Sequence, residues 1–282
     1  MGNNFKKGSV NSFDNNWKQR PETLYNHWSA GSPKNQIQLA FSQHYDLFIE
    51  LINKPDKLKV LEVGCGRGSL SSHFASKGHE CHLLDISETV INTAKEIFIK
   101  NKHEAHFYVG DANSLDFEES TFDVLVSIGL LEHFESLEQI IDEQYRVLKK
   151  GGILINYVVP ENKENVQKDF NWINDILKAQ SKNNDQIIIE KEELYRSDSD
   201  SKKYIKKYTE AGFKEIFSSG VYPLPMISPS IDFPFSLMDA ESERILVDNF
   251  KINLEKRKSK NSHPWLCDEE YGQAFIVTGK KL

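Results

Sequence analysis

Between residues 59 and 158, short runs of β-branched and aliphatic residues alternate with longer segments whose apolar positions recur at helical spacing. The predicted strands are residues 59–63, 80–84, 105–109, 122–127 and 153–158. The predicted helices between them are residues 70–76, 89–99 and 137–148. Strands that alternate with helices pair in parallel through right-handed crossovers, so the helices cover both faces of one sheet. The pattern predicts an α/β fold with a doubly wound sheet.

The flanking segments extend this core. A helix is predicted over residues 37–52, where apolar residues recur at helical spacing and Asn53 with Pro55 closes the run. Strands predicted over residues 214–222 and 273–278 complete a seven-stranded sheet. A long segment rich in proline and aromatic residues separates these two strands, and loops of this length in a compact domain are usually functional. We therefore expect a tail and helical cap over residues 1–52, an α/β domain over residues 53–222 and 267–282, and a substrate-covering insertion over residues 223–266.

The composition limits the partners of the chain. Of 282 residues, 39% are apolar and 27% are charged, which is typical of a globular protein. The net charge of -7 disfavours nucleic-acid binding, because phosphate contacts need basic surfaces. No stretch reaches the roughly 20 apolar residues of a membrane helix, and the polar start has no signal-peptide core. Three scattered cysteines form neither a disulfide framework nor a CxxC metal site, which favours a reducing cytoplasm.

Three glycines follow the first predicted strand on alternate positions. Gly64, Gly66 and Gly68 allow the backbone to turn sharply and to approach a ligand that a Cβ atom would obstruct. The helix that comes next points its free N–H groups at a polar or anionic group. A dinucleotide fingerprint would need its third glycine at position 69, which is Ser69. Cys65 is interpreted as a small filler in this turn, because the motif places no base beside it.

The glycine spacing, preceded by Glu62 in the strand, resembles motif I of the class I S-adenosylmethionine-dependent methyltransferases. Other segments agree with this family in order and place. They are Asp85 at the end of the second strand, Gly110-Asp111-Ala112 after the third, Phe122 to Phe134 around the fourth, and Val147 to Gly152 before the fifth. The resemblance covers about residues 58–160, and it also implies that the last strand runs antiparallel at the edge of the sheet.

The resemblance assigns the cofactor S-adenosylmethionine to the carboxyl ends of the strands. Its implied binding residues are Glu62, Gly64, Cys65, Gly66, Gly68, Asp85, Ile86, Asp111, Ala112 and Ile128. Glu62 would orient the methionine end, Asp85 the ribose and Asp111 the adenine amine, while the two isoleucines flank the adenine ring. Two alternatives remain open. Glu62 is alternatively a bridge between backbone groups, and Asp111 is alternatively a helix cap.

The N-terminal segment carries several aromatic side chains that a disordered tail seldom holds. Trp17, Tyr25, His27 and Trp28 are candidates to close over the cofactor, and Trp28 is predicted to bind it through a cation–π contact with the sulfonium. The alternative is that these rings only pack the cap. His133 follows the fourth strand and is the candidate general base, because imidazole titrates near neutral pH. Its alternative role is to shape the turn.

Several motifs that would define another substrate are missing. No Asp/Asn-Pro-Pro-aromatic motif follows the fourth strand, and Ser127 and Asn156 do not supply the acids of the metal-dependent catechol type. We therefore predict a metal-independent methyltransferase that acts on an O, N, S or C atom of a small molecule. Two other classes stay open, a noncatalytic S-adenosylmethionine-binding module and a NAD-dependent oxidoreductase.

Overall fold

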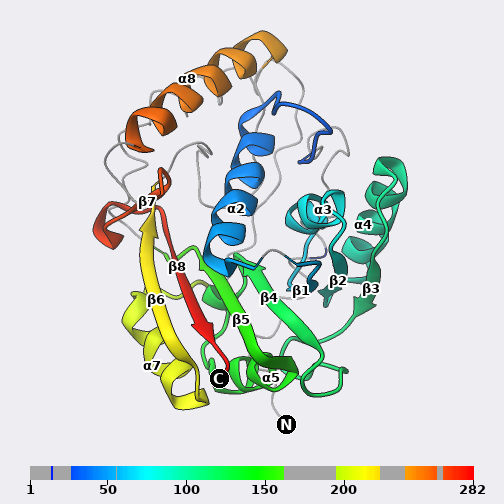
Figure 1. Ribbon diagram of the computed structural model, residues 1–282, viewed down its shortest axis with the longest axis vertical. Helices are drawn as coiled ribbons and strands as arrows, with labels where there is room; N and C mark the ends of the chain where they lie inside the picture. The colour runs from blue at the N-terminus through cyan, green and yellow to red at the C-terminus, as the bar shows by residue number, and fades with distance from the viewer. Residues whose placement is uncertain (1–13, 15–26, 55, 162–194, 223–238, 259–262) are drawn as a thin grey trace.

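The computed structural model describes residues 14, 27–54, 56–161, 195–222, 239–258 and 263–282 (Figure 1). Its centre is an eight-stranded sheet in the order β3-β2-β1-β4-β5-β8-β6-β7. The strands are β1 (Lys59–Val63), β2 (Glu80–Asp85), β3 (His106–Val109), β4 (Phe122–Ile128), β5 (Leu148–Val158), β6 (Lys214–Val221), β7 (Leu266–Cys267) and β8 (Ala274–Lys280). The first five strands pair in parallel, and the strand order reverses between β1 and β4. The doubly wound α/β prediction is confirmed.

The last strands correct two details of the expected sheet. β8 runs antiparallel as predicted, but it lies between β5 and β6 and not at the edge. The expectation of an edge strand was wrong, since β8 is an apolar run whose residues are buried from Ala274 to Gly279, as a strand with neighbours on both sides should be. The short strand β7 pairs with β6 and forms the edge, so the predicted count of seven strands was one too low.

Helices cover both faces of the sheet. They are α2 (Gln36–Ile52), α3 (Ser69–Ser76), α4 (Glu88–Asn101), α5 (Glu138–Val147), α7 (Ser201–Ala211) and α8 (Ala240–Lys258). One apolar cluster fills the layer beneath α2, α3 and α4, and a second fills the layer beneath α5 and α7 (Figure 1). No helix in these described ranges is long and apolar enough to cross a bilayer.

The helix α8 lies within the predicted insertion, at the top of the molecule in the direction in which β6 points (Figure 1). It contacts the start of α2 through Glu243, whose side chain is buried. The Gln36 backbone N–H donates to Glu243 Oε2 at 2.9 Å, and the Gln36 amide donates to Oε1 at 3.3 Å. A carboxylate at a helix N-terminus satisfies a backbone donor and complements the helix dipole. The contact therefore joins the predicted cap to the predicted insertion. Of these two segments, residues 1–13, 15–26, 223–238 and 259–262 lie outside the described residues.

Candidate functional site

The glycine turn after β1 adopts a conformation that only glycine tolerates easily. Gly64, Gly66 and Gly68 all have positive φ angles, of 68°, 52° and 70°. A Cβ atom at position 68 would lie 2.5 Å from Leu83 Cδ2 and 2.8 Å from Phe98 Cε2. Gly68 is also the N-cap of α3, so the close packing of this helix against β2 and α4 depends on the missing side chain.

Asp85 connects the glycine turn to the start of α4. Its Oδ2 accepts the Gly66 N–H at 3.0 Å, and its Oδ1 accepts the Ser87 N–H at 3.0 Å. Burial raises the pKa of this carboxyl, and the N–H donors of Ser87 and Gly66 oppose the shift. A carboxylate offers about four lone-pair sites, so two bonds to the backbone leave acceptor capacity for a ligand. The predicted ribose-binding residue is thus held rigidly against the predicted cofactor turn.

Cys65 and Glu62 are both buried beside this turn. The pKa of the Cys65 thiol is raised by burial, which keeps the sulfur protonated and agrees with a filler role. Glu62 Oε2 accepts from the Ser71 N–H at 3.0 Å and from Ser71 Oγ at 2.5 Å. Burial raises the pKa of Glu62 to about 7 despite these bonds. The carboxyl therefore anchors the first turn of α3, which supports the alternative that Glu62 bridges backbone groups.

Asp111 shapes the turn after β3. Its Oδ1 accepts from the backbone N–H and the side-chain amide of Asn113, at 2.9 and 3.0 Å, but the chain runs from β3 to β4 without a helix, so the helix-cap alternative for Asp111 is wrong. Ala112 is buried next to it, and the Gly110 N–H donates to Asp85 O at 3.0 Å. The turns after β2 and β3 are therefore tied together, as one binding site for a nucleoside requires.

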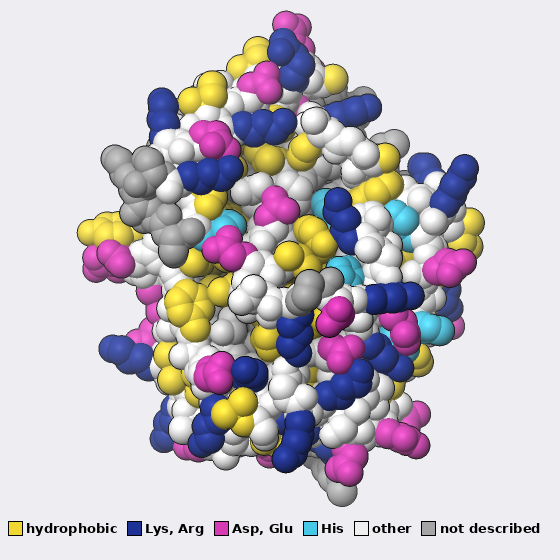
Figure 2. All heavy atoms as spheres, in the orientation of Figure 1, with side chains coloured by type: hydrophobic (Ala, Val, Ile, Leu, Met, Phe, Trp, Pro, Cys, Tyr) yellow, Lys and Arg dark blue, Asp and Glu magenta, His cyan; other side chains and the backbone are white. Residues whose placement is uncertain are grey.

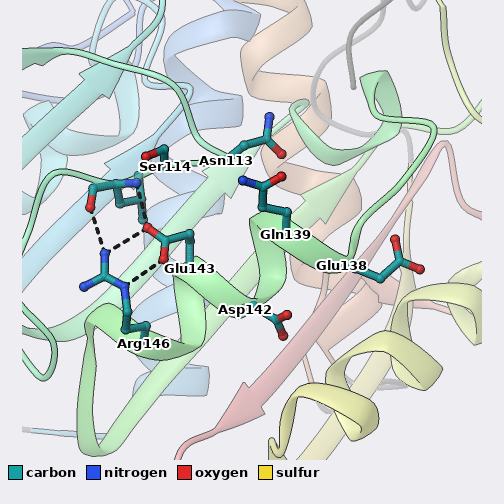
Figure 3. Close-up of a pocket in the computed structure, with 8 residues that line it drawn as sticks. Asn113, Ser114, Glu138, Gln139, Asp142, Glu143 and Arg146 are labelled. Carbon is teal, nitrogen blue, oxygen red and sulfur yellow. Dashed lines mark hydrogen bonds and ion pairs between the residues drawn. The ribbon is translucent and has the colours of Figure 1, made fainter. Parts of the chain in front are cut away.

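A hollow of about 530 Å³ lies beyond this turn, between residues 113–115 and α5 (Figure 3). Two of its lining side chains, Arg146 and Glu143, make contacts that stabilise the fold. Arg146 pairs with Glu143 at 2.7 Å and donates to Leu115 O and Phe117 O, which clamps α5 to the loop before β4. The hollow lies on the α5 face of the sheet, and the glycine turn does not line it.

The N-terminal cap reaches the site through His27. His27 Nδ1 lies 2.5 Å from Ser69 Oγ, at the first residue of α3, and its ring stacks on Phe41 at 5.1 Å. Trp28 instead packs edge-on against His103 at 4.4 Å. His103 lies just past the end of α4, a helix of 14 residues and about 21 Å that begins beside Asp85. The structure therefore supports the packing alternative for Trp28. Trp17 and Tyr25 lie outside the described residues.

The end of β4 brings together the remaining predicted residues. Ile128 is half-buried and packs against the apolar cluster beneath α2, while Ile86 is half-buried after Asp85. His133 ends a short 3-10 helix, η2 (Leu131–His133), and its Nδ1 lies 2.8 Å from Tyr195 O. A carbonyl oxygen only accepts, so Nδ1 carries the hydrogen in the neutral ring and Nε2 holds the lone pair.

Glu132 is a residue of the site that the sequence interpretation missed. Its side chain is 1% exposed, and Oε1 accepts the Val159 N–H at 3.3 Å. Oε2 has no hydrogen-bond partner within the described part of the chain. Burial raises the pKa of Glu132 to about 7. The signal in the sequence was an acid next to His133 in an otherwise apolar turn, and a buried acid in a cleft is a recognised mark of a functional site.

Ser127 and Asn156, which stand where the metal-dependent catechol type would need acidic residues, form a buried network of hydrogen bonds. The Ser127 hydroxyl bonds to Asn156 Oδ1, and the Asn156 amide donates to Tyr208 Oη at 2.5 Å and to Gln144 Oε1 at 3.2 Å. All four side chains are fully buried. The network fixes β4 and β5 against α5 and α7, directly below the end of β4.

Comparisons with known proteins agree with this geometry. Residues 61–156 match the family model described as "Methyltransferase domain". A demethylmenaquinone methyltransferase of Leptospira interrogans is 33% identical over 159 residues, which are 54% of this chain and 61% of that protein. A chloroplastic tocopherol O-methyltransferase of Arabidopsis thaliana is 30% identical over 46% of this chain and 42% of that protein. The chain thus matches less than two thirds of the length of either relative.

Solved structures share the fold over most of the chain. A SAM-dependent methyltransferase from Methanosarcina mazei has a TM-score of 0.52 and 18% identity, and the match covers 83% of this chain and 97% of that one. A structure described as "Conversion of a Disulfide Bond into a Thioacetal Group during Echinomycin Biosynthesis" has a TM-score of 0.56 and 17% identity, with coverage of 96% and 92%. These likenesses extend the shared fold beyond the segment that the family model matches.

Proposed function

We propose that this chain, whose residues 61–156 match a methyltransferase domain, transfers a methyl group from S-adenosylmethionine to a small-molecule acceptor. The observation that carries the proposal is the hydrogen bond from the Gly66 N–H to Asp85, which joins the glycine turn to the end of β2. A side-chain-free turn lies against the carboxylate of the next strand, which has acceptor capacity left for the two hydroxyls of a ribose. The glycine turn and the carboxylate acceptor of Asp85 together fit an adenosyl group.

The residues of the site would share the work as follows. Gly64, Gly66 and Gly68 admit the cofactor close to the backbone, Asp85 binds its ribose, and Ala112, Ile86 and Ile128 enclose its adenine. The bound cofactor supplies a methyl group that is already electrophilic because it sits on a sulfonium cation. The protein then needs to exclude water and to align the acceptor in line with the methyl group.

We propose His133 as the base that removes a proton from the acceptor. The bond from Nδ1 to Tyr195 O selects the tautomer whose Nε2 accepts a proton, and orients the ring. Glu62, Cys65 and Asp111 support the site through the contacts described above, whereas Trp28 packs against His103 at the far end of α4. The three cysteines are free, and we propose a reducing cytoplasm as the location. Basic and acidic side chains are interspersed over the face seen in Figure 2, which favours a small molecule over a nucleic acid as the acceptor.

The first test measures binding of S-adenosylhomocysteine by calorimetry. Asp85→Asn keeps the shape of the side chain but removes its charge, and we expect the Kd to rise roughly tenfold to hundredfold. Asp123→Asn is the matched control, because Asp123 accepts from Lys59 N at 2.9 Å and pairs with Lys149 at the amino end of β4. Wild-type protein that takes up no S-adenosylhomocysteine would refute the proposal.

The second test measures transfer. A panel of small hydroxyl, amine and thiol acceptors is incubated with S-adenosylmethionine, and formation of S-adenosylhomocysteine is measured. Formation with any acceptor establishes the enzyme and excludes a noncatalytic binding module. We then expect His133→Gln to lower kcat about a hundredfold without changing the Kd of S-adenosylhomocysteine. An unchanged kcat would leave His133 as a residue that only shapes the turn.

A further inference from the structure

A cluster of three aromatic side chains lies beneath α2, at the carboxyl end of β5. His44 on α2, Tyr157 near the end of β5 and Trp265 before β7 are 0%, 2% and 0% exposed. The His44 ring is 4.7 Å from that of Tyr157 and 4.4 Å from that of Trp265, edge to face in both pairs. Segments from three distant parts of the chain therefore meet in one buried contact.

Two polar atoms of this cluster lack a hydrogen-bond partner among the residues that the structure describes. His44 Nδ1 lies 3.0 Å from Ala40 O, so it carries the ring hydrogen and leaves a lone pair on Nε2. Burial lowers the pKa of His44 to about 3, so the ring is neutral at physiological pH. Within the described residues, neither His44 Nε2 nor the Trp265 indole N–H makes a hydrogen bond. One buried acceptor and one buried donor thus lie in two rings that touch.

Such a pair is uncommon in a folded protein. Most buried polar side-chain atoms are paired, and each unpaired atom costs about 1–3 kcal/mol. A hydroxyl group both donates and accepts, so a single hydroxyl satisfies His44 Nε2 and the Trp265 N–H together. The adjoining rings of Tyr157 and of Phe41, whose centroid is 5.3 Å from that of His44, complement a flat apolar body attached to that hydroxyl.

The cluster adjoins the proposed cofactor site. Tyr157 is the register partner of Ile128 in the β4–β5 pair, and the Gly129 N–H donates to Tyr157 O at 2.9 Å. Ligands of doubly wound sheets bind at this edge, so a molecule held by the cluster lies beside a cofactor held by the glycine turn.

We propose that His44 Nε2 and the Trp265 indole N–H bind the hydroxyl group of a planar, ring-bearing acceptor, and that they are specificity-determining residues. The proposal rests on the function proposed above, because it names the acceptor class of that site. Because the His44 and Trp265 rings are buried in contact with each other, they separate to admit the hydroxyl group of the acceptor between them.

The test uses the whole chain and two matched probes, 4-methylphenol and toluene, which differ by one hydroxyl. The protein contains four tryptophans, so ¹⁵N-labelled protein gives four indole N–H signals, and Trp265→Phe identifies the signal of Trp265. We expect 4-methylphenol to shift this signal at a concentration at least about tenfold below that at which toluene does, because one hydrogen bond is worth roughly that factor. Equal effects of the two probes overturn the inference, and this wild-type comparison needs no folded variant.

Two variants then assign the contact. His44→Phe keeps an aromatic ring and removes Nε2, so we expect the preference for 4-methylphenol over toluene to fall about tenfold, while the hydrogen bond from the Trp265 N–H remains. Phe41→Leu is the control, since it changes the apolar wall and removes no polar atom, and it should keep the preference. A preference that is unchanged in His44→Phe, or that falls equally in Phe41→Leu, refutes the assignment. Binding of S-adenosylhomocysteine is measured on the same samples. If it is present without any preference, only this inference fails, and if it is absent the proposed function fails.

Discussion

Glu132 is a buried carboxyl whose ionisation works against the fold. Its pKa is raised by burial from the ordinary 4.5 to about 7, so the folded chain holds this proton at a higher pH than the unfolded chain does. Protonated Glu132 therefore favours the folded state. Its contribution to the free energy of unfolding is complete below pH 4.5 and is lost as the pH rises through 7. At 1.36 kcal/mol per pH unit, the interval corresponds to about 3 kcal/mol.

Glu132→Gln removes this pH dependence, because the amide is neutral throughout. Urea unfolding of both proteins, followed by circular dichroism, gives the difference in the free energy of unfolding between variant and wild type at pH 5 and again at pH 8. We expect the variant to gain about 2–3 kcal/mol relative to the wild type between these pH values. The comparison cancels any constant cost of the amide, and also the titration of Glu62, which both proteins share. Differences that are equal at pH 5 and pH 8 would refute the reasoning that Glu132 ionises in a dry site.

Two further predictions use matched pairs and urea unfolding. Gly68→Ala should lose roughly 2–4 kcal/mol of stability and most of its cofactor affinity, because the new Cβ meets Leu83 and Phe98 at a positive φ. The control, Gly78→Ala, has a φ of 84° but open space, so it should lose only about 1 kcal/mol of stability. Equal losses in the two variants would contradict the packing argument. Glu138→Gln should behave opposite to Glu132→Gln. Hydrogen bonds from Lys207 and Ser136 hold the pKa of this exposed carboxyl at about 2, so its contribution is present above pH 4.5 and is lost as the pH falls through 2. Water screens this pair, so the loss should stay below about 1 kcal/mol and disappear in high salt, and a loss that persists in high salt would contradict a surface ion pair.

The sequence was most informative where local pattern decides the structure. The strand predicted over residues 59–63 matches β1, and the helix predicted over residues 89–99 lies within α4. Both are bounded by residues with their own signals, the glycine turn after β1 and the Ser87 side chain, which accepts from the Val90 N–H at 3.2 Å as an N-cap. The position of β8 had no such signal. Which neighbours a strand takes depends on contacts across the whole sheet, and the apolar run of residues 274–279 suits an inner place.

The site divides in the same way. The contact of Asp85 with the glycine turn was predictable, because residues that follow neighbouring parallel strands meet at the same edge of a doubly wound sheet. Glu132 was not predictable from pattern, since its burial depends on the segment around Tyr195 and Ser197, whose Ser197 N–H donates to Glu132 O at 2.8 Å. His27 and Trp28 are neighbours in the sequence, yet one contacts α3 and the other contacts His103. No helical or strand periodicity governs residues 27–35, so the direction of each ring is set by what it packs against.

The acceptor region that we propose around His44 and Trp265 shows most clearly why the acceptor class could not be predicted from the sequence. Its walls come from α2, from β5 and from the segment between α8 and β7, which are far apart along the chain. Glu243 is a buried acid that accepts two hydrogen bonds from Gln36 at the N-terminus of α2, 207 residues earlier. His44 belongs to the buried stripe of an amphipathic helix, where an imidazole has the same periodicity as a leucine. Its chemical role depends on the unpaired Trp265 N–H beside it, and this contact exists only after the sheet has brought β5 and the end of the insertion together.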